Sequence, residues 1–190
     1  FQIGPLIIVI FSVIFLKENV GYRRWLSVII GFSGTLFILK PGTTMFAIAG
    51  FFPILAAICY AGYAVSTRSL GTDEDPKTNF FYTSLVGTMI SSIILIPFFE
   101  PILLKDLALF SILGVIGGLG HFSFVIALRK SEASLLAPFT YFDLIFATIL
   151  GIIFFSEYPD TYVIIGASII VSAGIYTWYR ERVQSRNQSV

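Results

Sequence analysis

The chain has 190 residues, of which 56% are hydrophobic and only 12% are charged. Soluble globular domains carry roughly a quarter charged residues, so this chain has too little polar surface to face water on all sides, and we expect an all-α membrane protein. Its formal net charge of +1 leaves no basic excess to neutralise phosphates, which argues against nucleic acid as a partner.

Apolar stretches long enough to cross a membrane follow one another along the chain. A transmembrane helix needs about 20 mostly apolar residues. The stretches predict seven transmembrane helices, at 1–16, 25–40, 45–67, 79–98, 107–128, 134–155 and 161–179. The runs are continuously apolar rather than alternating, which argues against a membrane β-barrel. The sequence opens inside the first run, at Phe1 rather than Met, so we expect an N-terminal portion to precede it.

Lysine and arginine are distributed unevenly between the two sides of these spans. One side, with the C-terminal tail, holds ten of the twelve: Lys17, Arg23, Arg24, Arg68, Lys77, Arg129, Lys130, Arg180, Arg182 and Arg186. Only Lys40 and Lys105 lie on the other side. Because cytoplasmic loops are enriched in these residues, we expect a multi-pass protein of the cell (inner) membrane with a cytoplasmic C-terminus.

The first span and its following turn resemble the sixth. PLIIVIFSVIFLKE at 5–18 aligns without gaps to LIFATILGIIFFSE at 144–157, so that Glu18 pairs with Glu157. A second match follows after a one-residue gap, IIGFSG at 29–34 with IIVSAG at 169–174. Four predicted spans separate the two copies of the first match, so the second copy crosses the membrane in the opposite direction. Inverted repeats are a recurrent plan of secondary transporters, and we interpret both glutamates as anchors of helix ends.

The motifs LKE, RRW, IIGFSG and LKPG, followed by SLLAPFTYFDLIFATILGIIFFSEYPD and IIGASIIVSAGIY, resemble the EamA family of the drug/metabolite transporter superfamily. The resemblance covers the entire chain. It implies ten helices in two inverted five-helix repeats, of which this chain would hold the last seven. The implied parts are the last two helices of the first repeat at 1–41, a complete second repeat at 45–182 and a cytoplasmic tail at 183–190. The implied function is secondary transport of a small organic metabolite or drug by alternating access.

Two ionisable side chains, Asp143 and His121, lie well inside the predicted spans. At 1.5 Å per residue, both are about 10–14 Å from the cytoplasmic end of their helices, so they share a depth on consecutive helices, where pairing is feasible. Charged residues at such depth cost about 2.5–3.5 kcal/mol on insertion scales and face a bundle interior or a cavity. Gly114 and Gly118 share a face with His121, and their spacing predicts a close helix approach. Pro138, which lacks a backbone donor, predicts a kink beside Asp143.

Aromatic residues on the spans that the resemblance places around a central cavity complete the candidate site. The predicted solute contacts are Tyr60, Tyr63, His121, Phe124, Phe139, Tyr141 and Asp143. Asp143 and His121 are also the candidates for carrying a coupled proton. Burial and nearby charges shift side-chain pKa values, so both groups could gain and lose a proton near neutral pH. Structural interpretations stay open for the same residues: packing for His121 and the tyrosines, and a hydrogen-bonded neutral acid for Asp143.

Two other function classes are the alternatives. A membrane-embedded aspartyl protease needs two carboxylates within the membrane, and Asp143 is the only acidic residue well inside a predicted span. The sequence has no clustered Cys, His and Asp set for a metal and no phosphate-binding loop, so we expect no enzyme, no metal and no cofactor. A seven-helix receptor of the retinal type needs a lysine in its last helix, and 161–179 contains none. The expected partners are a small-molecule solute and the lipid bilayer.

Overall fold

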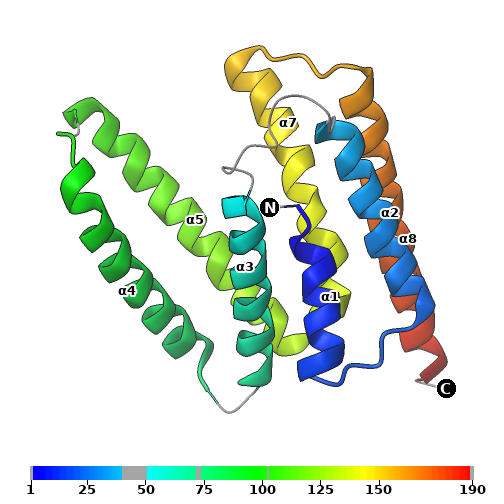
Figure 1. The fold of residues 1–190 in the computed structure, drawn as a ribbon. Coiled ribbons are helices and arrows are strands. Elements are labelled where there is room, and N and C mark those ends of the chain that lie inside the picture. The colour runs from blue at the N-terminus through cyan, green and yellow to red at the C-terminus, as the bar shows by residue number, and fades with distance from the viewer. Residues whose placement is uncertain (1, 40–50, 72–73, 102, 189–190) are drawn as a thin grey trace. The chain divides into compact units, whose positions relative to one another are not determined.

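The computed structural model describes residues 2–39, 51–71, 74–101 and 103–188, and every regular element among them is helical (Figure 1). The elements are α1 (Gly4–Phe15), α2 (Tyr22–Leu39), α3 (Phe51–Ser69), α4 (Pro76–Leu95), the 3₁₀ turn η2 (Ile96–Phe98), α5 (Leu104–Lys130), α6 (Ala133–Leu136), the 3₁₀ segment η3 (Ala137–Tyr141), α7 (Phe142–Phe155) and α8 (Thr161–Gln188). Residues 1, 40 and 45–50 of the predicted spans lie outside the described residues. The predicted tail at 183–190 is helical as far as Gln188, since its Arg and Gln residues are good helix formers.

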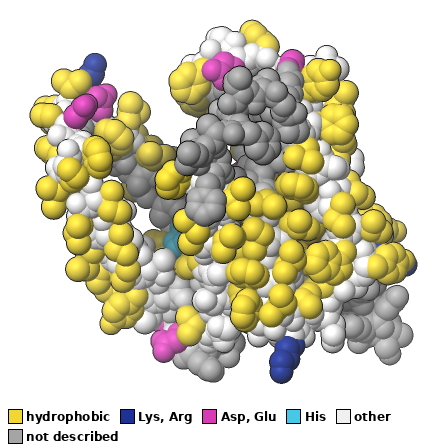
Figure 2. Space-filling model, in the orientation of Figure 1, with side chains coloured by type: hydrophobic (Ala, Val, Ile, Leu, Met, Phe, Trp, Pro, Cys, Tyr) yellow, Lys and Arg dark blue, Asp and Glu magenta, His cyan; other side chains and the backbone are white. Residues whose placement is uncertain are grey.

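Three helical stretches among the described residues are long and apolar enough to cross a membrane: Pro76–Phe98, Leu104–Lys130 and Ala133–Phe155. Gly4–Phe15 and Thr161–Thr177 are shorter apolar helices. Helix α4 buries none of its residues, and Figure 2 shows hydrophobic side chains along the sides of the helices and charged side chains near their ends. The expected all-α membrane protein is therefore confirmed, while the number of seven spans stays a prediction.

The chain divides into two compact units, Phe1–Ser66 with Glu132–Val190, and Thr67–Ser131. In the first unit, α2 and α8 lie side by side along their length, and α1 packs against α6 and η3 (Figure 1). In the second unit, α4 packs along α5. Each unit therefore contains helices that pack against one another.

Glycine lets the backbones of α2 and α8 approach closely in the first unit. A Cβ atom added at Gly34 would lie 2.8 Å from the carbonyl oxygen of Gly166, so neither position has space for a side chain. The approach predicted for α5 is different. An added Cβ atom meets nothing within 4 Å at Gly114, and at Gly118 it meets the ring of Phe80 at 3.8 Å. These two glycines therefore do not bring α5 into close backbone contact with α4, and a close approach to another helix stays a prediction.

The predicted break beside Asp143 is confirmed. Helix α6 ends at Leu136, the 3₁₀ segment η3 follows, and α7 starts at Phe142. Pro138 lies in the first turn of η3, where its missing N–H interrupts the helical hydrogen-bond ladder. The interruption makes Asp143 a first-turn residue of α7.

Helices α1 and α7 end with the same backbone geometry. Among the described residues, the non-glycine positions with positive φ are Lys17, at 55°, and Ser156, at 56°. In both cases the N–H of the next residue, a glutamate, donates over 3.2 Å to the carbonyl six residues earlier: Glu18 to Ser12 and Glu157 to Gly151. The alignment of 5–18 with 144–157 pairs these same positions, so the sequence match extends to local structure.

Candidate functional site

Polar side chains from α1, α3 and α7 meet around Asp143. The side-chain amide of Gln2 lies near enough to the carboxyl group of Asp143 to interact with it, so the start of α1 lies beside the start of α7. The hydroxyl group of Tyr60, on α3, lies near enough to this carboxyl group for an electrostatic interaction, and Tyr63 lies beside Tyr60. We call Gln2, Tyr60, Tyr63 and Asp143 the Asp143 cluster. Three of its four members are predicted site residues.

Small residues bring the helices of the cluster together. A Cβ atom added at Gly4 would lie 3.8 Å from Cδ1 of Tyr60 and 3.9 Å from Cβ of Ala57, so the start of α1 is in van der Waals contact with α3. Ala57, Ala61 and Ala64 are fully buried and form one stripe of α3 at helical spacing. Such stripes let helix backbones approach closely in membranes, which agrees with the contact of Gly4 with Ala57.

The chemistry of the Asp143 cluster suits a polar or cationic solute. The side chain of Asp143 is exposed, and those of Gln2, Tyr60 and Tyr63 are half-buried, so the cluster is open on one side. A carboxylate next to aromatic faces attracts organic cations through charge and cation–π interaction. Phenol and amide groups supply hydrogen-bond donors and acceptors for polar substituents.

Two other predicted solute contacts lie just before Asp143 in the chain, and their surroundings differ from one another. Tyr141 is fully buried, and its hydroxyl group donates over 3.4 Å to the carbonyl of Val28 on α2. Its ring lies against Gly31, where an added Cβ atom would come within 2.6 Å. Phe139 is 37% exposed and stacks on Phe142 at 6.2 Å. Tyr141 thus packs helices together, whereas Phe139 stays accessible.

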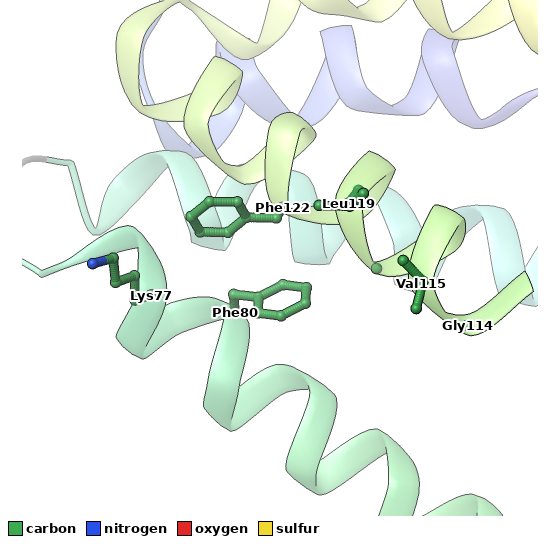
Figure 3. Close-up of a pocket in the computed structure, with 7 residues that line it drawn as sticks. Lys77, Phe80, Gly114, Val115, Leu119 and Phe122 are labelled. Carbon is green, nitrogen blue, oxygen red and sulfur yellow. The ribbon is translucent and has the colours of Figure 1, made fainter. Parts of the chain in front are cut away.

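His121 and Phe124 lie on α5, in the second unit, and both are half-buried. The ring of His121 is 5.7 Å from that of Phe80 on α4. Phe80 also meets Phe122 edge-on at 5.4 Å. A groove of about 370 Å³ lies beside these rings (Figure 3), lined by Lys77, Phe80, Gly114, Val115, Gly118, Leu119 and Phe122. Pairing of His121 with Asp143 would join the two units and stays a prediction.

Glu18 binds the start of α6. Its two carboxylate oxygens accept hydrogen bonds from the N–H groups of Ala133, at 2.9 Å, and Ser134, at 3.0 Å. Arg24 forms an ion pair with Glu132 and donates to the hydroxyl oxygen of Ser134 at 3.0 Å. A carboxylate is favoured at a helix N-terminus because the first N–H groups lack helical partners and the helix dipole is positive there. Glu18 is therefore an anchor of a helix end, as predicted, and the end that it binds belongs to α6.

Comparison with known proteins identifies the family. Residues 47–179 match the model of the EamA-like transporter family. The chain belongs to this family. The S-adenosylmethionine uptake transporter of Rickettsia bellii is 32% identical over 178 residues, which cover 94% of this chain and 61% of the relative. That of Rickettsia prowazekii is 30% identical over 187 residues, 97% of this chain and 64% of the relative.

A riboflavin transporter of Vibrio cholerae is 28% identical over 186 residues, 97% of this chain and 62% of that relative. The EamA-like chain thus spans about three fifths of the length of the curated relatives that it matches. No solved structure matches it. The family match includes Tyr60, Tyr63, His121 and Asp143, whereas Gln2 precedes the matched range.

Proposed function

We propose that the protein is a secondary transporter of a small organic solute and that the Asp143 cluster forms part of its binding site. The observation that carries the proposal is the meeting of Gln2, Tyr60 and Asp143 beside a helix interruption. In transporters, interrupted helices place backbone and side-chain groups at the depth where the solute binds. Irregular backbone at membrane depth occurs where it is buried in protein or lines a water-filled cavity, which fits a site at this break.

We further propose that transport follows alternating access between two inverted repeats. The matching ends of α1 and α7, at Lys17 and Ser156, support the repeat that the sequence predicts. The proposed parts are the end of a first repeat at 1–41, a second repeat at 45–182 and a cytoplasmic tail from 183. Rocking of one repeat against the other would expose a shared site to each side in turn.

S-adenosylmethionine is the first candidate solute. Four relatives named as S-adenosylmethionine uptake transporters are 29–32% identical to this chain. Its sulfonium group is an organic cation, which the carboxylate of Asp143 and the rings of Tyr60 and Tyr63 would attract. Riboflavin is the second candidate, because riboflavin transporters are 28–30% identical and a flat neutral ring stacks on the same tyrosines.

The test is uptake of radiolabelled S-adenosylmethionine and of riboflavin by the full-length protein in proteoliposomes. We expect Asp143→Asn to lower S-adenosylmethionine uptake about tenfold, which corresponds to about 1.4 kcal/mol of lost binding. The control is Asp106→Asn, which changes an acidic residue in the first turn of α5 and should leave uptake unchanged. Saturable S-adenosylmethionine uptake that the Asp143 change leaves intact would contradict the proposed site, and uptake of riboflavin alone would select the second candidate.

Proton coupling through Asp143 is a separate proposal. A coupled carboxyl group must release and take up a proton in each cycle, so its replacement by an amide removes the coupling step. We expect the wild-type protein to show uptake that depends on pH, and Asp143→Asn to show residual uptake with a flat pH profile. A wild-type pH profile in that variant would exclude Asp143 as the coupling group and leave His121 as the remaining candidate.

A further inference from the structure

Glu18 joins two neighbouring helical segments at one end. The segments are α1 and the run α6–η3–α7, and we call them the helix pair. The pair is antiparallel, because Glu18, after the end of α1, binds Ala133 and Ser134 at the start of α6. Gln2, before α1, lies beside Asp143 at the start of α7. The stretch from Ala133 to Asp143 therefore covers the whole of α1, and α7 runs on past its start (Figure 1).

The other end of the pair carries a second glutamate in the same backbone setting. Ser156 has the positive φ of Lys17, and the N–H of Glu157 bonds to Gly151 as that of Glu18 bonds to Ser12. The carboxylate of Glu157 is exposed and accepts no hydrogen bond from any residue that the structure describes. It lines a hollow of about 270 Å³ formed by α7, the following loop and the start of α8.

We propose that Glu157 binds the N-terminus of the helix segment that leads into α1 in the full-length protein, as Glu18 binds the N-terminus of α6. The repeat alignment supports this, because the counterparts of Ala133 and Ser134 would lie about six or seven residues before Phe1. The observed register supports it independently. The stretch from Ala133 to Asp143 is about ten residues long and runs alongside α1. A segment of similar length before α1, with a rise of about 1.5–2.0 Å per residue, would run alongside α7 as far as its C-terminal end.

With this contact, the helix pair would be held at both membrane surfaces by the same interaction, a glutamate carboxylate bound to the N–H groups of a helix start. The first N–H groups of a helix have no partner within the helix and attract negative charge. Each helix of the pair would thus carry, after its C-terminal end, the glutamate that satisfies the start of the other. The relatives that this chain matches are long enough to contain such a segment, since the chain covers only 61–64% of their length.

Cysteine cross-linking in the full-length protein, with Cys59 replaced by alanine, tests the contact. Glu157→Cys is paired with single cysteines at positions from about four to ten residues before Phe1, a window centred on the repeat alignment. The positive control pairs Glu18→Cys with Ala133→Cys, and the matched negative control replaces Glu157→Cys by Tyr158→Cys. We expect one or two positions near the seventh to cross-link to residue 157 as efficiently as the positive control. Efficient cross-linking of the control with none in the window would overturn the proposal.

A stability measurement provides a second test that does not depend on transport. In the full-length protein, Glu157→Ala should lower the thermal midpoint by several degrees, to a similar extent as Glu18→Ala, and Glu157→Gln should lower it less because one acceptor oxygen remains. A midpoint that Glu157→Ala leaves unchanged, in a protein destabilised by Glu18→Ala, would show that Glu157 binds no helix start.

Discussion

Replacement of Glu18 by alanine is the sharpest test of how the first unit is held together. The change removes both acceptors of the N–H groups of Ala133 and Ser134, at 2.9 and 3.0 Å. Hydrogen bonds to a charged group contribute about 1.5–3 kcal/mol each, and a charge at a helix N-terminus contributes about 0.3–1 kcal/mol. Because Glu18 is only half-buried, we take the low end of both ranges and expect a loss of about 3 kcal/mol in the free energy of unfolding.

For a protein of this size, 1 kcal/mol shifts the thermal midpoint by about 2–4 °C, so Glu18→Ala should lower it by about 6–12 °C. Tryptophan fluorescence during heating in detergent measures the shift. The control is Glu100→Ala, since Glu100 is exposed and forms no ion pair with the residues that the structure describes. Glu18→Gln should lose about half as much, because an amide oxygen can still accept one bond. Equal midpoints for Glu18→Ala and Glu100→Ala would refute the role of Glu18.

Two further substitutions separate packing from solute binding. Gly34→Ala places a Cβ atom 2.8 Å from the carbonyl oxygen of Gly166. It should lower the free energy of unfolding by about 1–3 kcal/mol in thermal denaturation, whereas Gly87→Ala, where an added Cβ atom meets nothing within 4 Å, should not. Tyr141→Phe removes only the 3.4 Å bond to Val28, so we expect a stability loss of about 0.5–1.5 kcal/mol with an unchanged KM for uptake. A raised KM would place the Tyr141 hydroxyl group in the binding site.

Helix positions could be predicted from the sequence because they depend on local features. Continuous apolar runs bounded by charges mark where a helix can lie in lipid, and the predicted sixth span at 134–155 agrees with the helical stretch Ala133–Phe155. The break at Pro138 was equally local, because it needs only the missing N–H group. The paired ends after α1 and α7 followed from matching sequence over fourteen positions.

The partners of each helix face could not be predicted in the same way. Gly114 and Gly118 have the spacing of a helix-packing motif, yet Gly34 and Gly166 form the close contact. A spacing motif shows that a backbone is accessible but does not identify the partner, and α2 and α8 are far apart in the sequence. The role of Gln2 was missed for a related reason. Its one signal is an amide in an otherwise apolar run, and its partner Asp143 is brought near by tertiary packing.

The orientation of Asp143 depends on the 3₁₀ segment η3. A residue of a 3₁₀ helix turns the chain by about 120°, against about 100° in an α-helix. Over the five residues of η3, the difference rotates α7 by about 100° relative to α6. Tyr141 is consequently buried while Asp143, two residues later, is exposed beside Gln2.

Pro138→Ala restores the missing N–H group and favours a continuous α-helix. The rotation would then turn Asp143 away from Gln2 and Tyr60, so we expect solute uptake to fall at least about tenfold while the protein still folds and inserts. Pro97→Ala, at the proline of the other 3₁₀ turn, η2, is the matched control and should leave uptake unchanged. Wild-type uptake and KM in Pro138→Ala would contradict the proposed role of the interruption. A binding site that tolerates this rotation of α7 cannot depend on the position of the Asp143 carboxylate.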